Sequence, residues 1–149
     1  MLKVNRKTDY AVRILLALAK QGYGARLSSP GIQREMLVPP ALMPRIVAEL
    51  AKAELIKTFP GRYGGMALAR PAAEITLRDV VEAFEGPVLL SHCLQVRGES
   101  DCPFQMSCPV RPKWGRVQVA MLREMAAISF EDLARESQGI PMLIESVVS

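Results

Sequence analysis

The sequence has no apolar run long enough to cross a bilayer, and residues 1–7 lack the apolar stretch of a secretion signal. We therefore expect a cytoplasmic protein without a membrane partner. The chain also lacks a C-x-x-C pair and a phosphate-binding loop, and its single histidine, His92, stands directly beside Cys93. These absences disfavour an enzyme, such as a thiol oxidoreductase, so we expect a protein without enzymatic activity.

Cysteine is absent from the chain outside one 16-residue window, which holds Cys93, Cys102 and Cys108. In a cytosolic protein such a cluster indicates metal, iron–sulfur or redox chemistry before a structural disulfide. The gaps of eight and five residues between the cysteines do not match the C-x2-C pairs of common zinc sites. Thiolates are soft ligands that suit iron. Two interpretations remain open: an iron–sulfur cluster, or a metal-free thiol/disulfide switch.

Acidic residues are scarce in the first half of the chain. Residues 1–70 hold four Asp or Glu against twelve Lys or Arg, a net charge of +8, whereas residues 71–149 have a net charge of −4. A basic segment joined to an acidic one predicts that the N-terminal half meets a polyanion, and duplex DNA is the obvious partner. The alternative is a winged helix used for protein interaction, which the basic charge disfavours.

Apolar spacing and cap residues predict three N-terminal helices followed by a β-hairpin. The helices are expected from Asn5 or Thr8 to residue 20, from a Ser28 cap to residue 36, and over residues 40–53; the strands are expected over 55–59 and 66–69. Two short helices joined by a tight turn, with a hairpin after them, form a winged helix-turn-helix. Pro44 would lie just beyond the first turn of a helix starting at Pro40, which predicts an irregular start.

The DNA contacts expected from this arrangement fall into three groups. Ser28 and Ser29 stand at a helix N-terminus, which favours phosphate. The start of the third helix faces base edges, and Arg45 is the best candidate to pair with guanine. The full set of expected contacts comprises Ser28 and Ser29, then Pro40, Ala41, Met43 and Arg45, then Arg62 and Tyr63 at the hairpin tip, and Lys3, Arg6 and Lys7 on phosphates.

Several segments, in this order, resemble the IscR/NsrR-type family of bacterial winged-helix regulators. They are Thr8-Asp9-Tyr10-Ala11, the apolar series Leu42, Ile46 and Leu50, residues 61–65 with 68–71, residues 75–83, the cysteine group, and Phe130-Glu131-Asp132-Leu133-Ala134. The resemblance covers about residues 1–136. It implies a homodimer in which the long helix expected over 113–128 crosses its twin, two winged helices on a pseudo-palindromic operator, and an iron–sulfur cluster on the three cysteines.

The fourth cluster ligand differs between branches of this family. In the branch with a 2Fe–2S cluster, a histidine lies three residues after the last cysteine, and here that residue is Arg111. In the nitric-oxide-sensing branch an N-terminal Asp of the partner subunit completes a 4Fe–4S cluster, and the matching residue here is Asp9. The resemblance therefore favours a 4Fe–4S cluster over 2Fe–2S. His92 is the less suitable ligand, since adjacent residues rarely both bind one small cluster.

We thus expect a mainly α fold with a small β-hairpin, in which a winged helix-turn-helix DNA-binding domain precedes a long C-terminal dimerisation helix. Residues 1–72 would form the DNA-binding domain, 73–136 the cysteine-loop sensor and dimerisation region, and 137–149 a tail. The expected function is a transcriptional repressor whose operator affinity depends on the cluster, sensing nitric oxide, redox or iron status. A cluster-free thiol/disulfide switch is the alternative.

Overall fold

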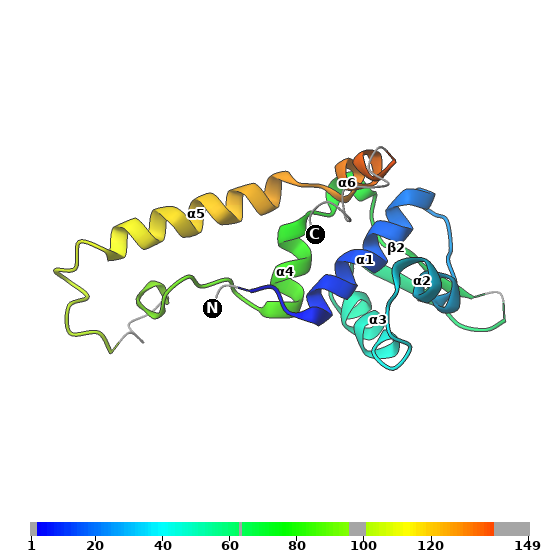
Figure 1. Cartoon of the computed structure of the whole chain (residues 1–149), viewed down its shortest axis with the longest axis horizontal. Helices are drawn as coiled ribbons and strands as arrows, with labels where there is room; N and C mark the ends of the chain where they lie inside the picture. The colour runs from blue at the N-terminus through cyan, green and yellow to red at the C-terminus, as the bar shows by residue number, and fades with distance from the viewer. Residues whose placement is uncertain (1–2, 63, 96–100, 139–149) are drawn as a thin grey trace, which may run out of the picture.

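The computed structural model describes residues 3–62, 64–95 and 101–138, and helices dominate it (Figure 1). The α-helices are α1 (Arg6–Gln21), α2 (Ser29–Met36), α3 (Met43–Lys52), α4 (Leu77–Glu85), α5 (Arg111–Ala127) and α6 (Phe130–Ser137). Strands β1 (Ile56–Phe59) and β2 (Gly65–Leu68) pair antiparallel, and two 3-10 turns are η1 (Ala72–Glu74) and η2 (His92–Leu94). The expected mainly α fold with one β-hairpin is confirmed.

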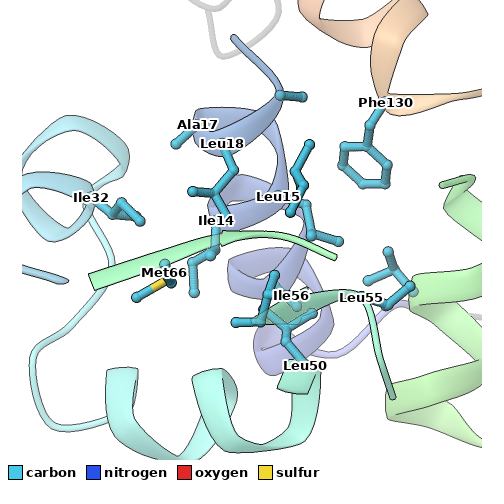
Figure 2. Close-up of a cluster of buried hydrophobic side chains, with 14 of the residues drawn as sticks. Ile14, Leu15, Ala17, Leu18, Ile32, Leu50, Leu55, Ile56, Met66 and Phe130 are labelled. Carbon is cyan, nitrogen blue, oxygen red and sulfur yellow. The ribbon is translucent and has the colours of Figure 1, made fainter. Parts of the chain in front are cut away.

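Helix α1 runs through the centre of the core (Figure 2). Its residues Ala11, Ile14, Leu15 and Leu18 are 0% exposed, and their three- and four-residue spacing puts them on one face of the helix. Asn5 caps the helix, since its side chain accepts a hydrogen bond from the amide of Thr8 at 2.9 Å. Local capping and apolar spacing therefore account for this helix, which begins where the sequence predicts.

Helices α2 and α3 form the helix-turn-helix. Ser28 caps α2 by accepting a hydrogen bond from the Gly31 amide at 3.2 Å, as expected. Helix α3 begins at Met43, later than predicted, because residues 40–42 form a tight turn in which the Leu42 amide donates to the Pro39 carbonyl at 3.0 Å. Pro44 consequently lies in the first helical turn, where its missing amide leaves no bond unmade.

The hairpin pairs Ile56 with Leu68 and Phe59 with Gly65, and a bridge from Leu27 to Met66 joins it to the segment before α2. Gly65 adopts φ +116°, and a Cβ placed on it would lie 2.5 Å from the Leu27 carbonyl oxygen. The close approach of these two backbones requires glycine here. It fixes the wing against the helix-turn-helix.

The core extends beyond residue 72. Ile75, Val80 and Phe130 are each 0% exposed and belong to the same apolar cluster as α1. The Phe130 amide donates to the Ile75 carbonyl at 2.9 Å, so the chain after α5 returns to the start of α4. The boundary expected after residue 72 therefore does not separate two cores, because α4 and α6 complete the winged-helix body. Most of the expected tail, residues 139–149, lies outside the described residues.

Helix α5 leaves this body. In Figure 1 the chain runs outward after α4 and returns along α5, so the cysteine segment lies at the outer end. None of its 17 residues is buried by the described parts of the chain. Within the described ranges, no helix combines the length and apolarity that crossing a bilayer requires.

Candidate nucleic-acid interface and thiol site

The start of α3 presents a basic side chain and two small apolar residues to solvent. The Arg45 side chain is 71% exposed, and its Nε lies 3.6 Å from a Glu49 carboxylate oxygen, which is a weak surface ion pair. Pro40 and Ala41 are exposed in the turn before the helix. Met43 is 1% exposed within the core, so it does not face a groove. The expectation that Met43 contacts a base is therefore corrected.

The α2 N-terminus and the hairpin tip supply the other expected contacts. Ser28 is exposed at the α2 cap, and Ser29, the first residue of the helix, is half-buried. Arg62 is exposed in the turn after Gly61, whose φ is +95°. Tyr63 lies outside the described residues, so its expected contact remains a prediction.

Sequence reasoning missed Arg26 as a candidate contact. Its guanidinium lies 3.6 Å from the centre of the ring of Phe59, the last residue of β1 before the hairpin turn, and Arg26 is exposed. Stacking on an aromatic ring holds a guanidinium in one orientation while leaving its edge available for phosphate. No local pattern reveals this pair, because it depends on the bridge between Leu27 and Met66.

The basic N-terminal residues do not all lie together. Arg6 is exposed, Lys7 is half-buried, and both belong to the first turn of α1. Lys3 lines a hollow of about 380 Å³ between α4 and α5, together with Glu85 and Met121. Lys3 therefore faces the side of the molecule from which α5 leaves.

The first turn of α1 is held to the end of α4 by a carboxylate. Glu85 Oε1 accepts hydrogen bonds from the Thr8 hydroxyl at 2.7 Å and from the Asn5 amide at 2.9 Å. The bond from the Thr8 hydroxyl and the bond from the Asn5 amide lower the pKa of Glu85. Asp9, the next residue along, is exposed and pairs with Arg13 at 2.8 Å. This Asn5–Thr8–Glu85 network fixes the helix end that carries Asp9.

The three cysteines lie in the segment that precedes α5, near the outer end of this helix. Cys93, in η2, is half-buried, and its Sγ lies 3.2 Å from the Ser91 hydroxyl. Cys108 is half-buried shortly before α5 and lines an open hollow of about 450 Å³, whereas Cys102 is exposed. Arg111 contacts both parts of this segment. It lines the same hollow as Cys108, and its Nε donates a hydrogen bond to the Cys93 carbonyl at 2.9 Å.

The donor chemistry of this segment fits an iron–sulfur cluster, because Cys93 and Cys108 carry free thiols and Cys102 stands between them in sequence. Across residues 3–62, 64–95 and 101–138, however, no three Cys, His, Asp or Glu side chains lie together in a group that could hold a metal ion. Asp9 lies in the first turn of α1, a helix of the body, whereas the cysteine segment runs outward from that body (Figure 1). His92 adjoins Cys93 in η2.

Comparison with known proteins identifies the group that this chain resembles. The sequence profile of the Rrf2 family, described as iron-dependent transcriptional regulators, matches residues 4–136. Protein aau3 of Rhizobium meliloti is 33% identical over 96% of this chain and 92% of its own length. The transcriptional regulator NsrR of Oceanobacillus iheyensis is 25% identical over 96% of this chain and 97% of its own length.

Solved structures agree with the fold. CymR, the global cysteine regulator of Bacillus subtilis, superimposes with a TM-score of 0.73 at 28% identity, covering 91% of this chain and 98% of its own. IscR of T. potens gives a TM-score of 0.72 at 22% identity, over 95% of this chain and 92% of its own. The IscR likeness supports the fold alone. Together these matches agree with the resemblance that the sequence motifs indicated.

Proposed function

Because the chain belongs to the Rrf2 family of transcriptional regulators, we propose that it represses transcription as a homodimer on operator DNA. We propose further that an iron–sulfur cluster on Cys93, Cys102 and Cys108 controls its affinity for that DNA. The observation that carries the proposal is the exposed helix α5 together with the cysteine segment that precedes it, which lies at the end of the molecule away from α3 and the wing (Figure 1). A site so placed acts on DNA contacts through the dimer rather than by touching DNA.

A second copy of the chain is the proposed cover for α5. Trp114, Val117 and Val119 on this helix are 43%, 50% and 54% exposed. A helix with no fully buried residue in its own subunit gains most from packing against a twin, since each large apolar side chain contributes ~1.5–3 kcal/mol when fully buried. Met121 and Met125, which line the hollow towards α4, add polarizable side chains that adapt to such a contact.

DNA binding rests on α3, the α2 N-terminus and the wing. Arg45 and Arg62 are exposed, and residues 1–70 carry a net charge of +8. Arg26 adds a guanidinium stacked on Phe59 at the end of β1. We propose that Arg45 contacts a base and that Ser28, Ser29, Arg26 and Arg62 contact backbone or minor groove. Such contacts weaken as salt concentration rises.

The proposed fourth ligand is Asp9 of the partner subunit. Asp9 is exposed on the first turn of α1. Its ion pair with Arg13 lies at the surface and is therefore weak, so Asp9 can leave Arg13 and bind iron instead. A bound cluster, for which we favour the 4Fe–4S form, would supply iron that nitric oxide or oxidants can attack. Thr8 and Glu85 hold the first turn of α1 in place. Binding or loss of the cluster at Asp9 would therefore act on α1, which also contacts α3 and β2 in the core.

The metal-free thiol/disulfide switch remains the second candidate, because Cys93 and Cys108 are free, half-buried thiols, and Arg111 both bonds the Cys93 carbonyl and lines a hollow with Cys108. Anaerobic purification separates the two. A visible charge-transfer spectrum with iron and sulfide bound to the protein, lost in C93S and C108S, supports the cluster. A colourless, iron-free protein after anaerobic reconstitution, with operator affinity that changes on oxidation, would replace it with the thiol switch.

The ligand assignment needs its own variant. We expect D9N to retain the fold but to hold the cluster less firmly, measured as faster loss of visible absorbance under a chelator. E35Q, which removes an exposed carboxylate from α2, is the matched control. Equal rates of cluster loss in D9N and the wild type would remove Asp9 from the ligand set.

A further inference from the structure

Arg111 stands where the 2Fe–2S branch of the family has a histidine, three residues after the last cysteine, and it makes a specific hydrogen bond in this chain. Arg111, the first residue of α5, donates its Nε–H to the Cys93 carbonyl at 2.9 Å. The bond spans 18 positions in sequence and links η2 to α5. Arginine is always protonated and has no lone pair to offer a metal, so it cannot act as the histidine would.

The contact between η2 and α5 has a second, apolar component. A Cβ placed on Gly115 would lie 3.8 Å from Leu94 Cδ2, so Leu94 packs on α5 at the turn after Arg111. Leu94, Arg111 and Gly115 line one hollow with Cys108. The η2 turn is itself closed by bonds from the Leu94 amide to the Ser91 carbonyl at 3.0 Å and from the Gln95 amide to the His92 carbonyl at 3.2 Å.

We propose that Arg111 is a positioning residue of the thiol site: by bonding the Cys93 carbonyl, it holds the Cys93 backbone at the start of α5, beside the hollow that Arg111 lines with Cys108. The inference rests on the proposed use of these cysteines as ligands, but concerns the protein before any cluster is bound. Two of the three thiols are thereby preorganised at the start of α5. Cys102, the remaining cysteine, is exposed.

This role differs from general structural support. The core lies around α1, and no described contact buries any residue of α5. Loss of the Arg111 side chain should therefore leave the thermal unfolding midpoint nearly unchanged, while separating Cys93 from Cys108. R111M keeps the apolar stem and removes the donor, R111K retains a donor, and R116M removes a guanidinium from the same helix as a matched control.

The test uses the cluster-free, reduced full-length chain in a C102S background, where only Cys93 and Cys108 remain. Diamide oxidises both thiols, with loss of two protons and two electrons, to one intramolecular disulfide while it is reduced to its hydrazine. We expect R111M to slow this closure several-fold, R116M to leave it unchanged, and R111K to restore most of the rate. Hydrogen exchange at Leu94 and Gln95 should accelerate in R111M alone.

A second measurement separates this inference from the proposed function. After anaerobic reconstitution of the three-cysteine protein, R111M should lose visible absorbance to a chelator several-fold faster than R116M, with R111K between them. Closure and exchange rates equal in R111M and R116M overturn the inference, whatever the cluster does. Slower closure in R111M, in a protein that binds no iron, upholds the positioning role and overturns the cluster proposal.

Discussion

Arg45 and Met43 are two positions apart on α3 and point to opposite environments. Met43 is 1% exposed in the core, whereas the Arg45 side chain is 71% exposed. The helical rotation between them points Met43 into the core and Arg45 towards solvent. The proposed role of Arg45 is a contact with DNA, and because its side chain is exposed, its loss should not affect folding.

R45A should weaken operator binding by about 5- to 150-fold, as expected for an arginine worth ~1–3 kcal/mol at one base pair. It should also relax the base preference at that position. R135A is the matched control, because Arg135 is 69% exposed and pairs with Glu131 at 3.7 Å on α6. Fluorescence anisotropy with a labelled operator measures both. An R45A affinity equal to that of R135A would show that α3 reads DNA elsewhere.

Gly65 links the wing to the helix-turn-helix by a close backbone approach. G65A places a methyl group 2.5 Å from the Leu27 carbonyl oxygen at a φ of +116°. We expect a loss of ~1–3 kcal/mol in the free energy of unfolding, measured in urea. G24A serves as the control, since Gly24 has φ +89° but, apart from Gly24 and its two chain neighbours, no described residue has an atom within 4 Å of the place its methyl group would take. Equal losses of unfolding free energy in G65A and G24A would mean that the positive φ, and not the contact with Leu27, causes the destabilisation.

Glu85 makes stability depend on pH through the Asn5–Thr8–Glu85 network. Its pKa is lower in the folded protein than in the unfolded chain, so its ionised form stabilises the fold above the unfolded pKa. That contribution disappears as pH falls through the lowered folded pKa. We expect the difference in unfolding free energy between wild type and E85Q to be largest near neutral pH and to shrink in acid. A difference that stays constant from neutral to acid pH contradicts this; E74Q, at an exposed position of η1, is the control.

At the scale of the elements, local signals set most boundaries. Ser28, Thr76 and Ser129 each cap the helix that follows, which fixes the starts of α2, α4 and α6. The sequence misplaces the start of α3 because Pro40 and Pro44 both suit a first helical turn, and only the turn at residues 40–42 decides between them.

Long-range contacts are beyond the reach of the sequence. The sequence predicts that Phe130 belongs to a short C-terminal helix, but not that its side chain is 0% exposed in the core around α1. The bond from Arg111 to Cys93 and the stacking of Arg26 on Phe59 likewise join segments distant in sequence. The motifs single out the cysteines and the third helix as candidates, but periodicity carries no information on which partner each side chain meets.

Helix α5 gives the prediction at this scale. V117E puts a charge on its exposed apolar surface and should shift the protein from dimer to monomer, measured by sedimentation equilibrium. L37E is the control, because Leu37 is also exposed, at 76%, but lies between α2 and α3. If V117E and L37E dimerise equally well, the dimer surface lies elsewhere than on α5.

At the scale of the whole molecule, the two sites are far apart along the structure. α3 and the wing lie at one end of the body, and the cysteines lie at the outer end of α5 (Figure 1). α4 stands between them, contacting α1, α3 and α5. A change at the thiols can therefore alter DNA binding only by repositioning these helices, or a second subunit, relative to one another.

The most direct test of this account is operator affinity of the same preparation with and without its cluster, at one fixed salt concentration under anaerobic conditions. We expect the cluster-loaded homodimer to bind operator at least tenfold more tightly than the cluster-free form, and both to weaken as salt rises. Equal affinities in the two states would contradict control by the cysteine site.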